Sequence, residues 1–232
     1  MTPPKALLIA LSGPSSSGKT TLARLLRDII PHSFILHEDD FYKTDAEIPV
    51  NPEHNLEDWD CLESLSLPAL ESALRHVRDH GMIPVDLENV DAALIERLKV
   101  ESASKGQNTL PVAIIDGFLL YSEDLKAVRD LFDVKLFLHT DYHTAKTRRE
   151  ARSGYVTIEG FWADPPGYVD KIVWPNYVKD HAFLFRNGDV NGELDIAALT
   201  KLGIEGMPMS ARGDMTACLK WAYEIVQRAL QA

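Results

Sequence analysis

The chain has 232 residues, and its 45% apolar content is enough to build a folded core, which excludes a disordered chain. Its formal net charge of -11 argues against nucleic acid and anionic membranes as partners, because both require a basic surface. Two distant cysteines, Cys61 and Cys218, exclude a disulfide framework and a CxxC site. Free thiols and the lack of a long apolar run near the start predict a cytoplasmic protein, with a nuclear location also open.

The first predicted elements are a strand and a helix. Residues 6–12 form a short apolar run that ends at Gly13, which is typical of a buried strand. Residues 20–30 carry apolar side chains at helical spacing, and Pro31 ends the predicted helix.

Residues 13–20, between this strand and helix, read Gly-Pro-Ser-Ser-Ser-Gly-Lys-Thr and fit the P-loop pattern G-x-x-x-x-G-K-[ST]. In such a loop, backbone N–H groups surround the phosphates of a nucleoside triphosphate. Lys19 would reach the β- and γ-phosphates, and the Thr20 hydroxyl would ligate Mg2+. The motif predicts ATP binding but does not specify the reaction that follows.

A second predicted strand, residues 33–37, runs directly into the acids Glu38, Asp39 and Asp40. Because neighbouring side chains of an extended chain point to opposite faces, we expect only one of Asp39 and Asp40 to face the cleft. A carboxylate there could accept the proton of an attacking hydroxyl group or help to hold Mg2+. An acidic turn that caps a helix is the alternative interpretation.

The middle of the chain is less informative. Residues 48–60 contain two prolines and are predicted to be irregular, and residues 67–80 have helical spacing. A helix over residues 91–100 and an exposed loop over residues 102–108 are also expected. Together, residues 81–108 are interpreted as a variable insertion.

Residues 112–115 are an apolar run followed by Asp116, which indicates a buried strand that ends in an acid. This pattern is similar to a Walker B strand, whose acid binds Mg2+ or its water ligands. A P-loop requires such a partner, so we expect Asp116 to take this role.

Residues 134–139 form another predicted strand, and a basic helix follows at residues 141–152. Arg148 and Arg152 are four residues apart and therefore share a helical face. Arginine side chains match phosphate oxygens and stabilise the charge that develops during phosphoryl transfer. We interpret residues 141–167 as a lid, although a solvated basic helix is the alternative.

A turn at residues 162–167 and helices at residues 168–180 and 214–230 complete the predicted elements. Strands that alternate with helices predict a single three-layer α/β/α domain with a parallel sheet and a helical lid. Ligands of such folds bind at the carboxyl ends of the strands. Two histidine pairs with i,i+4 spacing lack further metal ligands and are interpreted as structural: His76/His80 and His139/His143.

Taken together, these motifs resemble those of nicotinamide riboside kinases, within the larger group that includes uridine kinases. The fungal members are the most similar, because they share residues 187–190. The resemblance implies a P-loop NTPase fold and the ATP-dependent phosphorylation of nicotinamide riboside to nicotinamide mononucleotide, a step in NAD biosynthesis. Its motifs are residues 13–21, 39–43 and 116–120, Trp59-Asp60, the arginines up to Arg152, and Pro166-Gly167-Tyr168.

The resemblance also implies the role of each residue. Asp39 would be the general base, and Lys19, Arg148 and Arg152 would act on the transferred phosphate. The implied ligands of Mg2+ are Thr20, Asp39 and Asp116. The implied substrate-binding residues are Asp39, Tyr42, Trp59, Asp60, Arg149, Tyr155 and Val156. The implied ATP-binding residues are Gly13, Ser15, Ser16, Ser17, Gly18, Lys19, Thr20, Thr21, Arg148, Val190 and Asn191.

Two other interpretations stay open at this stage. A uridine or cytidine kinase would share the P-loop and a similar acidic segment, and a regulator that binds nucleotide without transferring phosphate would share the P-loop alone. Nicotinic acid riboside is a further candidate substrate. The Trp59-Asp60 pair and the Asp-Pro-Pro-Gly-Tyr turn favour nicotinamide riboside over the pyrimidine nucleosides.

Overall fold

A computed structural model describes residues 5–84, 110–157 and 160–231. Its centre is a five-stranded sheet in the order β2-β5-β1-β6-β9, and every neighbouring pair of strands is parallel. The predicted parallel sheet is therefore confirmed. The strands are β1 (Leu7–Ser12), β2 (Ser33–His37), β5 (Val112–Asp116), β6 (Val134–Phe137) and β9 (Ile204–Gly206).

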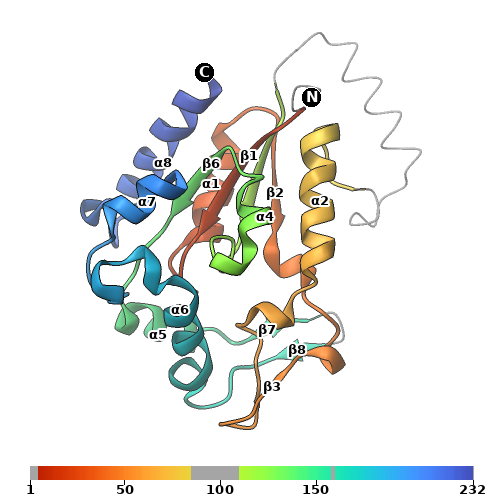
Figure 1. Cartoon of the computed structure of the whole chain (residues 1–232), viewed down its shortest axis with the longest axis vertical. Helices are drawn as coiled ribbons and strands as arrows, with labels where there is room; N and C mark the ends of the chain where they lie inside the picture. The colour runs from red at the N-terminus through yellow and green to blue at the C-terminus, as the bar shows by residue number, and fades with distance from the viewer. Residues whose placement is uncertain (1–4, 85–109, 158–159, 232) are drawn as a thin grey trace.

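Helices cover both faces of this sheet, which gives the three layers predicted from the sequence (Figure 1). One face packs against α1 (Lys19–Ile29) and α8 (Met215–Leu230). The other face packs against α2 (Leu67–His80), α4 (Lys126–Arg129), α6 (Trp174–His181) and α7 (Ile196–Leu202).

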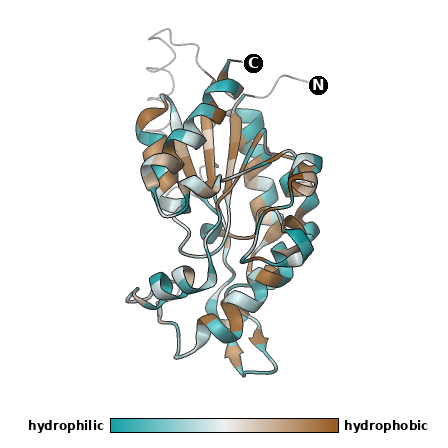
Figure 2. Cartoon of the chain, turned by 90° about the vertical axis from the view of Figure 1, so that its left-hand side faces the viewer, coloured by the Kyte–Doolittle hydropathy of each residue, from teal (hydrophilic) through white to brown (hydrophobic). Residues whose placement is uncertain are grey.

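The central strands β1 and β5 are apolar along almost their whole length because both faces of the sheet are buried. In β1, Leu8 and Ala10 belong to one apolar cluster, whereas Ile9 and Leu11 belong to the other. All four side chains have 0% exposed surface. The view in Figure 2 shows the hydrophobic strands enclosed between helices with more hydrophilic outer faces.

The register of the sheet brings three of the predicted functional segments to one edge. Leu11 of β1 and His37 of β2 both pair with Asp116 of β5, so these strands end at the same level. The P-loop, the acidic turn after β2 and the segment after β5 therefore start side by side. The chain termini lie at the opposite end of the molecule (Figure 1).

Several local features differ from the predictions. The irregular segment 48–60 contains a short hairpin of β3 (Val50–Asn51) and β4 (Leu56–Glu57). The helix predicted over residues 168–180 begins with a π-helical turn, Val169–Val173, before α6. Pro175 lies just beyond this junction and has no N–H to continue an α-helical pattern. Strand β9 and helices α4 and α7 were not predicted.

The lid region contains α5 (Tyr142–Glu150), which confirms the predicted basic helix, and a hairpin of β7 (Tyr155–Val156) and β8 (Phe161–Trp162). The helix and loop predicted over residues 91–100 and 102–108, and most of the predicted insertion, lie outside the described residues. Within the described ranges, no helix is long and apolar enough to span a membrane.

His181 is the last residue of α6 and lies in the core on the face of the sheet that this helix covers. Its ring is fully buried and stacks on Tyr177 and Phe137, with centroid distances of 4.7 and 5.7 Å. Burial lowers the pKa of His181 to about 4. The unfolded chain takes up this proton near pH ~6.5, so the stability that neutral His181 contributes is complete above that pH and is lost as the pH falls towards 4.

We expect the unfolding free energies of the wild type and His181→Phe to diverge with pH. Between pH 7 and 4 the wild type should lose about 3 kcal/mol relative to the variant, because only the wild type must protonate this ring on unfolding. Urea titrations at several pH values measure this difference. His143→Phe, a change at an exposed site, is the control for histidine removal. If the difference in unfolding free energy between the wild type and His181→Phe did not change with pH, the lowered pKa of the buried His181 ring would be contradicted.

Candidate active site

The P-loop connects β1 to α1, and its glycines allow a path that other residues would block. Gly13 and Gly18 have φ angles of 145° and 101°, which side-chain-bearing residues rarely adopt. A Cβ atom on Gly13 would lie 2.3 Å from the carbonyl oxygen of Leu138. The loop therefore lies directly against the chain that leaves β6, and its N–H groups can surround an anion.

Lys19 is the first residue of α1, and its side chain folds back over the loop. Its Nζ donates hydrogen bonds to the carbonyl oxygens of Gly13 and Pro14, at 3.0 Å each. Burial lowers the pKa of Lys19, whereas the carboxylates of Asp116 and Asp39 oppose this shift. A phosphate chain in the loop would give this ammonium group stronger, charge-assisted partners.

The acids after β2 do not continue an extended chain. Residues Glu38–Phe41 form one 3-10 turn, and Asp40 accepts a hydrogen bond from the N–H of His37 at 3.3 Å. Both Asp39 and Asp40 line the same cleft as Lys19. The expectation that only one of them faces the cleft is wrong, because alternation applies to a strand and not to a helical turn.

Asp39 and Asp116 have different electrostatic surroundings. The cleft walls restrict solvation of Asp39 although its side chain is accessible from the cleft, and this burial, followed by the nearby Asp116 charge, raises the pKa of Asp39 to about 6. Burial would likewise raise the pKa of Asp116. Hydrogen bonds from His37 and Thr20 and the charge of Lys19 nevertheless hold the pKa of Asp116 below its ordinary value.

The oxygen-bearing side chains at this end of the cleft fit Mg2+. Thr20, Asp39 and Asp116 all line it, and the hydroxyl of Thr20 bonds to the carboxylate of Asp116. Mg2+ is bound in proteins by one or two carboxylates, with waters and substrate phosphates completing its shell. Within the described ranges, no group of three or more His, Cys, Asp or Glu side chains could hold a metal ion.

Glu38 is a residue that the sequence analysis left without a role. It is fully buried, and its Oε2 accepts hydrogen bonds from the N–H groups of Phe118 and Leu119 at 2.6 and 3.0 Å. Burial raises the pKa of Glu38 to about 8. A Cβ atom on Gly117 would lie 2.6 Å from Oε2, so a glycine is required there. Glu38 therefore ties the turn that carries Asp39 to the segment that follows Asp116.

Aromatic side chains line the other end of the cleft. Tyr42 lies edge-on to Trp59 at 5.5 Å and stacks with Phe118 at 6.4 Å, and its hydroxyl donates to the carbonyl oxygen of Trp59. Trp162 lies 5.7 Å from Trp59. Tyr155 and Val156 of β7 complete this wall from the lid. These faces suit a flat ring, and a cationic one gains from the quadrupole of the aromatic groups.

Asp60 and Arg149 form a bidentate ion pair at this end. Arg149 Nη1 and Nη2 lie 2.7 and 3.0 Å from the two carboxylate oxygens of Asp60. Arg149 is 7% exposed and Asp60 is 6% exposed, so the pair is removed from bulk water. Arg149 also contacts Asp164, which the sequence analysis had assigned only to a turn. The sequence Asp-Pro-Pro-Gly-Tyr indicates a turn, but no periodicity of the sequence links Asp164 to Arg149, fifteen positions earlier.

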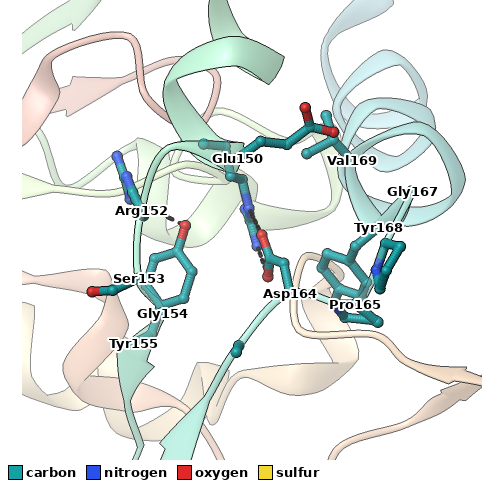
Figure 3. Close-up of a pocket in the computed structure, with 13 residues that line it drawn as sticks. Glu150, Arg152, Ser153, Gly154, Tyr155, Asp164, Pro165, Gly167, Tyr168 and Val169 are labelled. Carbon is teal, nitrogen blue, oxygen red and sulfur yellow. Dashed lines mark hydrogen bonds and ion pairs between the residues drawn. The ribbon is translucent and has the colours of Figure 1, made fainter.

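Arg148 on α5 and Arg152 just after this helix are both exposed. Arg148 donates to the carbonyl oxygen of Ser16 in the P-loop at 3.3 Å. Arg152 donates to the hydroxyl of Tyr155 at 3.2 Å and lies over its ring. Figure 3 shows this contact across a pocket of about 200 Å3 at the base of the lid. Both guanidinium groups can reach anionic oxygens without breaking a buried ion pair.

A single cleft of about 1130 Å3 brings most of the predicted residues together. Gly13, Ser17, Val190 and Asn191 are outside its lining. Val190 is buried, and its carbonyl oxygen lies 3.0 Å from Nε2 of His139. Asn191 accepts a hydrogen bond from the N–H of Tyr142 at the start of α5. The predicted residues that line the cleft are Ser15, Ser16, Gly18, Lys19, Thr20, Thr21, Asp39, Tyr42, Trp59, Asp60, Asp116, Arg148, Arg149, Arg152, Tyr155 and Val156.

No protein-family model matches this chain. A nicotinamide riboside kinase of Schizosaccharomyces pombe is 44% identical over 238 residues, spanning 98% of this chain and 99% of that protein. The Saccharomyces cerevisiae enzyme of the same name is 37% identical over 84% of this chain and 85% of its own length, and human nicotinamide riboside kinase 2 is 32% identical over 78% and 70%.

Among solved structures, a shikimate kinase from Acinetobacter baumannii superposes with a TM-score of 0.42 at 11% identity, covering 97% of this chain and 94% of that one. The fold assignment rests on the sheet order and the P-loop described above. With 44% identity to a curated enzyme along nearly its whole length, the chain belongs to the nicotinamide riboside kinase family.

Proposed function

We propose that this chain transfers the γ-phosphoryl group of ATP to the 5′-hydroxyl group of nicotinamide riboside, giving ADP and nicotinamide mononucleotide for NAD biosynthesis. The observation that carries the proposal is one continuous cleft. It has a P-loop and two carboxylates at one end and an aromatic wall with a buried acid at the other. Its volume of about 1130 Å3 is large enough for a triphosphate and a nucleoside together, and the family membership supports the same reaction.

At the phosphate end, the P-loop amides and Lys19 would bind the β- and γ-phosphates and hold the γ-phosphorus in line with the acceptor. Asp39 would accept the proton of the attacking hydroxyl group. Thr20, Asp39 and Asp116 would hold Mg2+, which when bound would supply positive charge that offsets the charge of the phosphates. Arg148 and Arg152 would stabilise the negative charge on the transferred group and on the leaving ADP.

At the nucleoside end, Asp60 would accept hydrogen bonds from the ribose hydroxyl groups. The pyridinium ring would lie among Tyr155, Trp59 and Tyr42, because a cationic ring is attracted to aromatic faces. Val156 is 88% exposed and would cover the substrate from the lid. Val190 and Asn191 would border the adenine side of ATP.

The domain organisation and the compartment belong to the same proposal. Residues 1–232 would form one kinase domain in which residues 141–167 act as the lid and residues 81–108 are an insertion. The reaction would take place in the cytoplasm. Cys61 and Cys218 are buried free thiols, and burial raises the pKa of each, to about 12 and about 11. Neither needs an oxidising compartment.

A coupled ADP-release assay over a panel of nucleosides tests the substrate. We expect the highest kcat/KM with nicotinamide riboside, and nicotinic acid riboside tests whether a carboxylate on the ring is tolerated. A site that favours a cationic ring should discriminate against uridine and cytidine by at least about tenfold, which corresponds to about 1.4 kcal/mol. Turnover of uridine without turnover of nicotinamide riboside would overturn the proposal. ATP binding without any product would favour a regulator.

A further inference from the structure

Asp164 lies at the point where the chain returns from the lid hairpin towards α6. Its carboxylate accepts hydrogen bonds from Arg149 Nε at 2.6 Å and from Arg149 Nη2 at 3.2 Å. It also accepts a hydrogen bond from the indole Nε1–H of Trp162 at 2.9 Å. Figure 3 shows Asp164 lying between Tyr155 and Tyr168. Its side chain is only 13% exposed.

Arg149 has no donor left for a ligand in this arrangement, so the substrate contact that the resemblance implies for Arg149 would require one of its present hydrogen bonds to be exchanged. A guanidinium group carries five N–H donors. Two bond to Asp164, two bond to Asp60, and one bonds to the hydroxyl of Ser15 at 3.2 Å. The rings of Tyr155 and Tyr168 lie 5.2 and 5.5 Å from its central carbon, so its faces are also occupied.

Asp60, in contrast, keeps acceptor capacity. Each carboxylate oxygen has two lone pairs, and Arg149 uses one on each oxygen. The two that remain can accept hydrogen bonds from two vicinal hydroxyl groups. Their direction depends on the plane of the carboxylate, which the planar guanidinium of Arg149 sets. That plane is set in turn by the second fork, from Arg149 to Asp164.

We infer that Asp164 is a positioning residue for the nucleoside: it fixes Arg149 in the plane that aims the Asp60 oxygens at the ribose diol. Through Trp162, it also makes this alignment depend on the position of the lid hairpin. Asp164 has no direct contact with the phosphate end or the acidic turn, and its only link to the P-loop described here is the bond from Arg149 to Ser15, so we expect its main effect on the nucleoside. This inference rests on the proposed function for the identity of the substrate.

The test is the Asp164→Asn variant, assayed with nicotinamide riboside and with its 2′-deoxy analogue. Asparagine offers its NH2 group to one of the Arg149 donors, so the fork cannot form. Breaking one arm of a buried, paired charge should lower kcat/KM for nicotinamide riboside roughly 10- to 100-fold, mainly through KM. The KM for ATP should stay within about twofold of the wild type. The preference for the riboside over its 2′-deoxy analogue should also fall several-fold, which a general loss of folded protein would not cause.

Two further variants accompany this test. Glu150→Gln removes the same charge from a neighbouring exposed position, where Glu150 pairs with Lys146 at 3.8 Å, and should leave the KM values of both substrates unaffected. Trp162→Phe keeps an aromatic ring but removes the Nε1–H donor to Asp164, and should change the 2′-deoxy preference in the same direction by a smaller factor. If circular dichroism shows that Asp164→Asn is unfolded, the Trp162→Phe result decides.

An unchanged 2′-deoxy preference in a folded Asp164→Asn protein would overturn the inference, as would an equal rise in both KM values. Failure of the proposed function is recognised separately, because it concerns the wild type. If the wild type phosphorylates another riboside instead, the same variants are measured with that riboside and its 2′-deoxy form.

Discussion

The Asp39→Asn enzyme is expected to bind ATP with near-normal affinity and to lose roughly 100- to 10,000-fold in kcat, the range typical of a lost general base. Asparagine has nearly the same shape as aspartate, so the 3-10 turn Glu38–Phe41 should persist. It cannot accept a proton, and it is a weaker ligand for Mg2+. Single-turnover kinetics with saturating ATP and nicotinamide riboside measure the loss.

Asp40→Asn is the matched control, because Asp40 is the adjacent acid on the same turn and lines the same cleft. Asparagine keeps an oxygen that can accept the hydrogen bond from the N–H of His37. A change of less than about fivefold is expected. If the two variants lost turnover equally, the site would depend on total negative charge and not on one base.

The pH profile gives a second readout for Asp39. Its pKa is raised to about 6, and the base works only when deprotonated, so kcat/KM of the wild type should fall as the pH drops through 6. Bound Mg2+ favours the carboxylate and would move this acid limb lower, never higher. The residual activity of Asp39→Asn should lack the limb. An acid limb of the same midpoint in both proteins would assign it to another group.

The Lys19→Met enzyme is expected to lose on the order of 100- to 1,000-fold in kcat, because it removes a preorganised charge at the transferred phosphate. In the structure the Lys19 ammonium group bonds to two loop carbonyls, so it is already positioned over the P-loop. Methionine fills a similar volume without the charge. Isothermal titration with ATP should also show weaker binding, in contrast to Asp39→Asn.

Lys146→Met is the control for removing a lysine near the cleft. Lys146 lies on α5 and pairs with Asp170 at 2.6 Å, away from the P-loop. Near wild-type kinetics are expected for this variant. Should Lys19→Met retain full turnover, the P-loop lysine would have no part in transfer, and the proposed phosphate contacts would be wrong.

Much of the fold could be predicted because its strands are buried on both faces. The strand predicted over Ser33–His37 and the helix over Leu67–His80 have the same bounds in the structure. Strong apolar runs and a glycine after the helix carry this information locally. Strand β9 is only three residues long, Ile204–Gly206, and it forms because β6 offers an edge to pair with. No local pattern marks such a strand.

The phosphate end of the site was predictable for a different reason. The P-loop is one continuous segment whose spacing has a direct physical meaning, so Lys19 and Thr20 could be named from the sequence. The family was also named correctly, because several separate motifs had to occur together. Assigning Asp39 over Asp40 required the resemblance, because the 3-10 turn exposes both to the cleft.

The nucleoside end was less predictable because its contacts join distant segments. Asp60 and Arg149 could be named only from the resemblance, and their ion pair spans 89 positions of the chain. Asp164 was missed because a turn motif explained it adequately. Glu38 was missed because a buried acid that accepts N–H groups from Phe118 and Leu119 has the same sequence signature as an exposed one.

The most direct test of the central claim is the product stoichiometry of the purified wild-type protein. Incubation with ATP, Mg2+ and nicotinamide riboside, followed by chromatographic separation, should yield nicotinamide mononucleotide and ADP in equal amounts. Neither product should accumulate when nicotinamide riboside is omitted. ADP formed without nicotinamide mononucleotide, or no consumption of ATP under these conditions, would contradict the claim that this cleft phosphorylates nicotinamide riboside.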